Sequence, residues 1–303
     1  MSIQRPLPPG AWCVDRGDPD FPPALADDPR PPERIHGLGE LDLLAKGRPR
    51  VGMVGARRCT SYGRDVARSF GRELAAAGVS VVSGLALGID GAAHEGALQA
   101  ADGAPPIGVV ASGLDVVYPR QHLRLWDSVG ELGCLITEAD FGTKPEHWRF
   151  PERNRIIAAL SDIVLVVEAH PTSGTRHTVD AAIERGVPVM AVPGPVGSKA
   201  SEGSNQLLRE GCAPACELDD VLTALGLERC SGAPFVDIRR RPDACDEGIL
   251  AAVDWAPTSL EKLMRRTTLG PGEITAALYR LLSKGWVRCT DGWWERIAAP
   301  GAP

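Results

Sequence analysis

Asp162-Ile-Val-Leu-Val-Val-Glu168 is the most β-rich run of the chain, and the polar turn Thr172-Ser-Gly-Thr175 follows it. An unbroken run of aliphatic residues, several of them β-branched, predicts a strand that is buried on both faces. A helix is expected at 177–185 and a further strand at 188–192. Strand, turn, helix and strand in this order are typical of an α/β fold.

The same alternation extends in both directions along the chain. The pattern predicts strands at 51–54, 79–83, 107–111 and 134–137, and helices at about 61–78, through 92–94, at 152–160 and at 203–211. Strands that alternate with helices form a mostly parallel sheet with helices on both faces. Ligands of such folds bind beyond the carboxyl ends of the strands, so the loops that follow the strands are candidate binding loops.

The length of 303 residues suggests one large and one small domain. Residues 1–50 hold ten of the 26 prolines and are expected to pack as an extended leader on the main domain. The main domain is predicted at 51–225, and a polar linker at 226–243. A small domain is predicted at 244–297.

The small domain has the pattern of a winged helix. Thr258-Ser-Leu-Glu261 is typical of a capping box, and Pro271 is typical of a first helical position. Two short strands then flank Asp291-Gly292, which favours a type I′ turn. The tail is only slightly more basic than acidic, so DNA binding and protein docking both stay open.

Composition excludes several classes of protein. The net charge of −6 argues against DNA binding over the whole surface but permits a local basic groove. No apolar run approaches the roughly 18–20 residues that span a bilayer, and the N-terminus lacks a signal-peptide core, so a cytoplasmic protein is expected. The 8 cysteines are scattered, and Cys212 and Cys216 have no second ligand pair. We therefore expect reduced thiols and neither a metal nor a cofactor.

Phe150-Pro-Glu-Arg-Asn-Arg-Ile-Ile157 places an aromatic ring and two arginines at a predicted helix start. Helix starts attract anions, so Arg153 and Arg155 are predicted to clamp phosphates and Phe150 to stack on a base. Replacing both arginines with alanine is expected to remove most DNA binding. The alternative is a solvated helix start with a core phenylalanine.

Other loops at the same sheet edge are also suited to phosphate. In Gly55-Ala-Arg57 the glycine permits close approach of an anion and Arg57 supplies a phosphate fork, although a tight turn explains the same residues. Ser173, Gly174 and Thr175 predict an anion-binding nest or an ordinary helix cap.

Three further residues have open roles. Asn205 is suited to hold either a backbone group or a base edge, and Lys144 extends the basic strip toward Arg155. His94 is expected to be a structural residue rather than a base. No nucleophile with a base and no pair of carboxylates emerges from the spacing, so no catalytic residue is predicted.

Eight ordered motifs resemble the DprA/Smf family of bacterial DNA-processing proteins. They are Val54-Gly-Ala-Arg57, Val82-Ser-Gly-Leu-Ala-Leu-Gly-Ile-Asp90, Ala93-His94, Gly113-Leu-Asp-Val-Val-Tyr-Pro119, Phe150-Pro-Glu-Arg-Asn-Arg155, Val167-Glu-Ala169, Ser173-Gly174 and Ala191-Val-Pro-Gly194. The resemblance implies an extended Rossmann-like domain that binds single-stranded DNA, forms a homodimer and loads the recombinase RecA during DNA uptake or recombination. It assigns phosphate binding to Gly55 and Arg57, and the DNA groove to Lys144, Phe150, Arg153, Asn154 and Arg155.

The chain departs from the family pattern at several positions. The family commonly has Arg where this chain has Leu87 and Ser where it has Ala56, and Arg176-His-Thr-Val179 replaces the usual Leu-Ile-Thr-Ala. The leader is also too short for the helical domain common at the family's N-terminus. These departures leave open whether the role is natural transformation or another DNA-processing or defence role.

Two alternatives belong to other classes. One is a nucleotide-binding protein or an enzyme that resembles the nucleoside-monophosphate phosphoribohydrolases of the wider fold superfamily, whose signature carries a catalytic Glu where this chain has Thr178. A transcription regulator acting through the winged helix is the other alternative, and the weakly basic tail counts against it.

Overall fold

The computed structural model describes residues 3–4, 6, 9–45, 47–227, 241–255 and 257–297. It divides into two compact units, residues 1–230 and 231–303. The predicted linker at 226–243 lies almost entirely outside the described residues. In the described part of the chain, no helix has the length and apolar character needed to cross a membrane.

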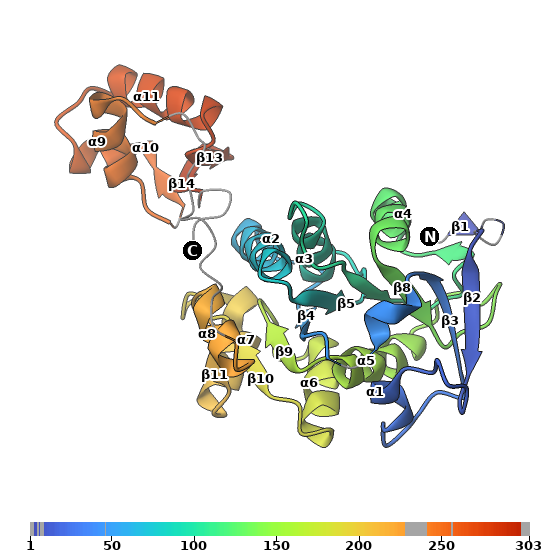
Figure 1. Cartoon of the computed structure of the whole chain (residues 1–303). Coiled ribbons are helices and arrows are strands. Elements are labelled where there is room, and N and C mark those ends of the chain that lie inside the picture. Colours follow the sequence, from blue (N-terminus) through green and yellow to red (C-terminus); the bar gives the residue numbers. More distant parts are fainter. Residues whose placement is uncertain are drawn as a thin grey trace. The chain divides into compact units, whose positions relative to one another are not determined.

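A nine-stranded sheet organises the first unit (Figure 1). Its strand order is β11-β10-β9-β4-β5-β6-β8-β3-β2, and all neighbours are parallel except β8-β3 and β3-β2. The strands are β2 (Ala11–Asp15), β3 (Arg34–Gly39), β4 (Arg50–Val54), β5 (Ser80–Ser83), β6 (Ile107–Val109), β8 (Cys134–Thr137), β9 (Ile163–Val166), β10 (Val189–Ala191) and β11 (Ala213–Pro214). The predicted α/β class and mostly parallel sheet are therefore confirmed. A separate short pair joins β1 (Ile3–Gln4) to β7 (Val116–Val117).

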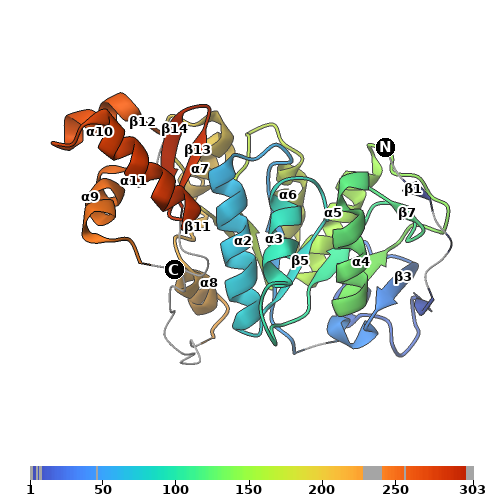
Figure 2. The ribbon, with the colours of Figure 1, turned by 90° about the horizontal axis from the view of Figure 1, so that it is seen from above.

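Helices cover both faces of the sheet, as Figure 2 shows from above. One face carries α2, α3 and α4, and the other carries α5 and α6. The helices of this unit are α1 (Pro23–Ala26), α2 (Ser61–Ala76), α3 (Ile89–Ala97), α4 (Leu123–Leu132), α5 (Arg149–Leu160), α6 (Thr175–Glu184), α7 (Glu202–Arg209) and α8 (Leu218–Ala224), with 3-10 turns at Leu41–Leu44, Arg120–His122 and Lys199–Ser201.

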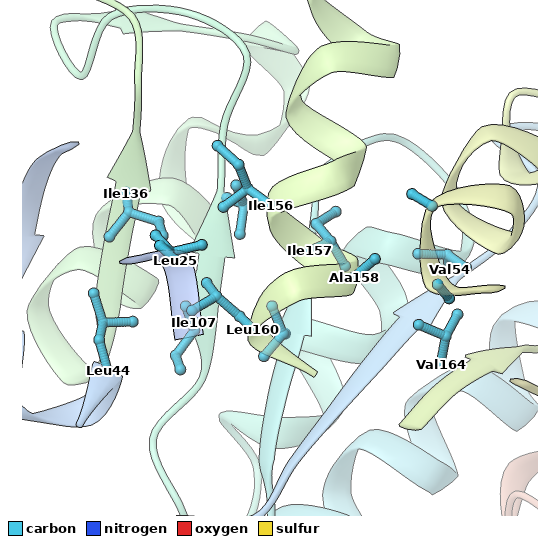
Figure 3. Close-up of a cluster of buried hydrophobic side chains, with 14 of the residues drawn as sticks. Leu25, Leu44, Val54, Ile107, Ile136, Ile156, Ile157, Ala158, Leu160 and Val164 are labelled. Carbon is cyan, nitrogen blue, oxygen red and sulfur yellow. The ribbon is translucent and has the colours of Figure 1, made fainter. Parts of the chain in front are cut away.

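The central strands are buried on both sides, as their apolar sequences predict. Successive side chains of β9 point to opposite faces, so Ile163 and Leu165 join the core under α2 and α3 while Val164 joins the core under α5. Figure 3 shows the α5 side, where Ile156 and Leu160 pack beside the strands. This double burial holds the carboxyl ends of the strands at one edge.

The leader does more than pack in extended form on the main domain. Residues 11–15 and 34–39 form β2 and β3, which join the sheet beside β8 in antiparallel orientation. The prolines between these strands lie in the connecting loop and in α1. The high proline content of residues 1–50 therefore gave no indication of the two short strands. The fold of the first unit thus includes the predicted leader.

The second unit is a winged helix, as predicted. Its elements are α9 (Ala244–Ala252), β12 (Thr258–Ser259), α10 (Leu260–Arg266), α11 (Pro271–Ser283), β13 (Val287–Thr290) and β14 (Trp293–Arg296). Helix α9, capped by the Asp243 side chain, was not predicted. Ser259 rather than Thr258 caps α10, since the Ser259 side chain accepts a hydrogen bond from the Lys262 N–H. The turn at Asp291 and Gly292 has φ angles of 51° and 83°, as a type I′ turn requires.

A buried ion pair ties the leader to α6. The Arg185 guanidinium donates to both carboxylate oxygens of Asp28, at 2.5 and 2.9 Å, and the Asp28 side chain is 0% exposed. Burial raises the pKa of Asp28, but the hydrogen bonds from Arg185 and from the Arg30 backbone outweigh it, so the net pKa is lowered.

Asp28→Asn is expected to lower the free energy of unfolding by about 3 kcal/mol near neutral pH, because it leaves the Arg185 charge buried without its partner. Since the folded pKa of Asp28 is depressed, this contribution is present above the unfolded value of about 3.9 and is lost as the pH falls through the folded value. Denaturant unfolding at neutral and acidic pH measures the difference, which should shrink in acid. Asp20→Asn, at an exposed position, is the control and should change little. An Asp28→Asn variant as stable as the control would refute this role.

Candidate nucleic-acid-binding site

A groove lies at the carboxyl edge of the sheet, where the loops after β4 and β5 meet the first turns of α5 and α6. It encloses about 470 Å³, part of which is open to solvent. Its lining comes from four separate segments of the chain, as expected where several strands end together. The lining residues are Val54, Gly55, Arg57, Ala86, Asp90, Phe150, Pro151, Arg153, Asn154, Gly174, Thr175, His177 and Thr178.

Gly55 serves close packing of the loops. A Cβ at this position would lie 2.7 Å from the Glu168 carbonyl oxygen and 2.6 Å from the Ile89 side chain. The next N–H group, of Ala56, donates to that same carbonyl of Glu168 at 2.6 Å. These backbone groups, which were predicted to face an anion, instead contact one another across the loops after β4, β5 and β9.

An internal carboxylate occupies the start of α2. Glu168, 2% exposed at the end of β9, accepts hydrogen bonds from the backbone N–H and the hydroxyl of Thr60, both at 2.7 Å. Thr60 in turn caps α2 by accepting from the Gly63 N–H. The Glu168 carboxylate already accepts hydrogen bonds at this helix start. Of the phosphate site predicted here, the side chain of Arg57 therefore remains.

Arg57 and Phe150 form one layered contact. The exposed Arg57 guanidinium lies over the Phe150 ring, 4.5 Å from its centroid, and the Tyr118 ring packs 5.6 Å from Phe150 at an angle of 42°. The guanidinium therefore covers part of the ring to which base stacking was assigned. Arg57 combines an exposed charge with a planar face, and both suit a nucleotide.

Arg153 lies beneath the groove as a buried residue, 4% exposed. Its guanidinium donates to the carbonyl oxygen of Gly84 at 2.7 Å, to that of Val109, and to the Asn154 amide oxygen at 3.1 Å. Burial lowers the pKa of Arg153 to about 10, although the nearby Asp90 carboxylate opposes this shift. In place of the phosphate that was predicted as its partner, the structure gives Arg153 internal partners, which tie together the ends of β5 and β6.

Asp90 supplies the counter-charge of Arg153. It is 6% exposed and accepts from the Gly84 N–H at 3.2 Å. Burial raises the pKa of this carboxyl, while the charges of Arg153 and Arg57 lower it in part. The sequence suggested only a helix-capping role for Asp90. Its electrostatic interaction with Arg153 was not predicted, because the two residues are far apart in the sequence.

Arg155 also has internal partners and does not line the groove. It is 7% exposed, donates to the Arg30 carbonyl oxygen at 2.7 Å and is ion-paired with Glu138 and Glu152. In place of the predicted phosphate, the structure gives Arg155 these internal partners, so the side chain turns toward the leader and holds α5 against it.

The remaining predicted residues lie in or near the groove, except for Asn205. Asn154, Gly174 and Thr175 line the groove, and the Asn154 amide donates weakly to the Gly174 carbonyl oxygen at 3.4 Å. Ser173 lines a neighbouring hollow with Thr175. The Asn205 amide bonds both the N–H and the carbonyl of Gly194, at 3.1 and 3.0 Å, so of its two predicted options the structure shows the backbone one.

Lys144 lies exposed on the loop between β8 and α5, outside the groove lining. Trp148 on the same loop is 56% exposed, with Arg149 4.3 Å from its ring centroid. Sequence reasoning missed Trp148 and Tyr118, although an exposed aromatic residue beside Arg149 is a signal typical of nucleic-acid binding.

Groups suited to catalysis or metal binding are sparse at this edge. Among the lining residues only Asp90 carries a carboxylate, and Thr178 stands where the related hydrolases have their Glu. His94 is fully buried, and this burial lowers its pKa to about 4. Within the described ranges, no cluster of three His, Cys, Asp or Glu side chains is placed to hold a metal ion.

The basic side chains of the winged helix are largely engaged within that unit. On α11, Arg280 and Lys284 both bind Asp246, whose side chain is 0% exposed, at 2.7 and 3.0 Å. On α10, Lys262 and Arg266 both pair with Asp254. These pairs reduce the positive charge that a DNA-reading helix needs.

Comparisons with known proteins agree with this architecture. The family model of DNA recombination-mediator protein A matches residues 12–226, and that of the DprA winged helix domain matches residues 237–292. Protein Smf of Escherichia coli is 35% identical over 91% of this chain and 75% of its own length. DprA of Bacillus subtilis is 38% identical over 64% of this chain and 65% of its own length.

Two solved structures resemble the chain. DprA from Streptococcus pneumoniae aligns with a TM-score of 0.66 and 37% identity, covering 70% of this chain and 73% of that one. DprA from Helicobacter pylori, described for its single-stranded DNA binding mode, aligns with a TM-score of 0.64 and 27% identity over 71% of this chain and 95% of that one.

The two arginines of the groove should differ in what they contribute to stability. Arg153→Leu is expected to lower the free energy of unfolding by about 3–5 kcal/mol, because it leaves two strand-end carbonyls without their donor and removes a charge that stabilises the buried Asp90 carboxylate. Arg57→Ala, at an exposed position, should stay within about 0.5 kcal/mol of the unmodified protein. Chemical denaturation measures both, and equal effects would contradict the assignment of Arg153 to the floor.

Proposed function

Because the chain belongs to the DNA recombination-mediator protein A family, known as DprA or Smf, we propose that it binds single-stranded DNA in the groove beyond β4 and β5. The observation that carries this proposal is the exposed Arg57 guanidinium lying on the Phe150 ring at the groove wall. This pair offers a phosphate fork and planar surfaces within a few ångströms, which is the combination that single strands require.

Each side chain of the groove has a defined part in this proposal. Arg57 binds a phosphate, and a base stacks on the Phe150 and Arg57 layer or displaces the guanidinium from the ring. Asn154 and the start of α6 at Gly174 contact the sugar-phosphate backbone. Arg153 keeps the floor in place, and Lys144 on the adjoining loop binds a neighbouring phosphate.

Selection of single strands follows from the shape of the groove. Stacking on Phe150 requires a base whose face is free, and the bases of a duplex are already stacked on one another. The protein as a whole carries a net charge of −6, so attraction of DNA depends on the local cations. A duplex, which offers only its phosphates, gains less from this site.

We extend the proposal to the cellular role that the family suggests. The protein acts as a homodimer in the cytoplasm, protects incoming or exposed single strands and loads the recombinase RecA onto them during DNA uptake, transformation or recombination. Family membership and the relatives' names as DNA-processing proteins support this role.

A phosphoribohydrolase activity has less support. That reaction depends on a carboxylate at the position of Thr178, which is a buried residue here. The Asp90 carboxylate in the groove is held by the Gly84 N–H and faces Arg153. We therefore propose a binding protein without catalysis of its own.

Arg57→Ala is expected to weaken binding of a single-stranded oligonucleotide by about tenfold, because it removes a charge-assisted hydrogen bond to phosphate. The slope of log K against log salt should become shallower by about 0.7 for each phosphate that the variant no longer neutralises. Fluorescence anisotropy at several salt concentrations measures both quantities.

Arg16→Ala serves as the matched control, because Arg16 is an exposed arginine of the same unit beyond the end of β2. It should change neither the affinity nor the salt slope. Equal affinity of the unmodified protein for single- and double-stranded oligonucleotides would overturn the proposal.

RecA loading has a separate test. Addition of the protein to single strands coated with single-strand-binding protein should shorten the lag before RecA begins to hydrolyse ATP. Arg57→Ala should restore most of that lag, because the strand is no longer held. An unchanged lag with the unmodified protein would leave DNA binding intact as a proposal and exclude RecA loading.

A further inference from the structure

The loop between β5 and α3, residues 84–88, holds one residue in an unfavourable backbone conformation. Leu85 has a φ angle of 52°, in the left-handed region, and its side chain is fully buried. A residue with a Cβ atom is strained there, so this conformation persists only where neighbouring groups hold it. The contacts of Leu85 therefore show which group keeps the loop in place.

The His122 imidazole holds the Leu85 backbone. Its Nδ1 lies 2.9 Å from the Leu85 carbonyl oxygen, and because a carbonyl oxygen only accepts, Nδ1 carries the hydrogen and is the donor. His122 stands at the N-terminal end of α4, and its ring packs against Gly91 of α3, where a Cβ would lie 2.3 Å from Cε1. Gly91 thus leaves the space in which the ring reaches Leu85.

The neighbouring carbonyl groups of the loop also have donors outside it. The Arg153 guanidinium donates to the carbonyl oxygen of Gly84 at 2.7 Å, and the Gly91 N–H donates to that of Ala86 at 3.0 Å. Three successive carbonyl groups are therefore bonded to α5, to the start of α4 and to α3. The donor to the strained residue is His122.

The end of the loop contacts the turn that carries Arg57. The Ile89 N–H donates to the Ala56 carbonyl oxygen at 3.2 Å. A Cβ at Gly88 would lie 2.2 Å from that oxygen and 2.8 Å from the Arg57 carbonyl oxygen, so the two backbones are closely packed. The Arg57 guanidinium in turn lies over the Phe150 ring. A shift of the loop is therefore expected to displace the Arg57 side chain.

We propose that His122 is a positioning residue for DNA binding, which keeps Arg57 in its place on the groove wall by holding the Leu85 carbonyl. The inference rests on the proposed binding of single-stranded DNA in the groove. His122 is not among the residues that line the groove, so it acts through the loop and not on the strand. Without its hydrogen bond, Leu85 relaxes from the left-handed region, the loop shifts against Ala56, and Arg57 occupies its place less of the time.

Two variants separate the donor of His122 from the volume of its ring. His122→Phe keeps a ring against Gly91 and removes the donor, so it should weaken binding of a single-stranded oligonucleotide about fivefold. His122→Asn keeps an N–H donor at the position of Nδ1 and should bind within about twofold of the unmodified protein. Fluorescence anisotropy measures both affinities. The slope of log K against log salt should be unchanged in both variants, because no phosphate contact is lost.

Amide hydrogen exchange tests the loop itself in the absence of DNA. Residues 84–91 should exchange faster in His122→Phe than in the unmodified protein or in His122→Asn, while strands β4 and β9 should exchange as before. If thermal melting shows that His122→Phe is unfolded, His122→Ala takes its place with the same expected results.

Gln121→Ala is the matched control, because Gln121 is an exposed residue of the same 3-10 turn, and it should change neither affinity nor exchange. Unchanged affinity of His122→Phe, unchanged exchange of residues 84–91, or a shallower salt slope would overturn the positioning role alone. Faster exchange throughout the sheet would do the same, because it would show a general loss of stability. Absence of single-strand binding by the unmodified protein would overturn the proposed function and this role together.

Discussion

The buried guanidinium of Arg153, with the Asp90 carboxylate as its nearby counter-charge, is the constraint on which the edge of the sheet depends. Arg153 bonds carbonyl groups at the ends of β5 and β6, and Asp90 sits at the start of α3, which follows β5. A charge in the interior is stable only with a partner and with its donors satisfied, so the pair holds these elements together. Arg153 and Asp90 both line the groove, together with Phe150.

Internal groups occupy several positions that resemble phosphate sites. Glu168 satisfies the start of α2, Asn205 holds the Gly194 backbone and Arg155 pairs with Glu138. The groups that the groove still presents include the exposed side chain of Arg57, the ring of Phe150 and the side chain of Asn154. Such a site suits a polymer, whose many weak contacts add along the chain, better than a single nucleotide whose phosphate needs a dedicated nest.

The winged helix follows a similar principle of internal pairing. Asp246 accepts from both Arg280 and Lys284 on α11, so the basic groups of that helix stabilise its own unit. The exposed residues Tyr279 and Leu282 lie on the same helix. The sequence left DNA binding and protein docking open for this unit, and the pairing of its basic residues weakens the first.

The sequence by itself indicated the parallel strands from β4 to β10, the helices α2, α3, α5, α6 and α7 and the winged helix, because the burial of apolar residues has a period that is visible locally, but it missed α4 and α8. The motif around Phe150 also located the binding edge, since helix starts and strand ends are local features. Only the tertiary structure decided which charges face solvent. The sequence alone does not distinguish the environments of Arg57 and Arg153. Arg57 lies on the groove wall and Arg153 lies beneath it, because the partners of Arg153 come from strands distant in sequence. The leader's two strands were hidden for the same reason, since β2 pairs with β3 and β3 pairs with β8, which lies about a hundred residues further on.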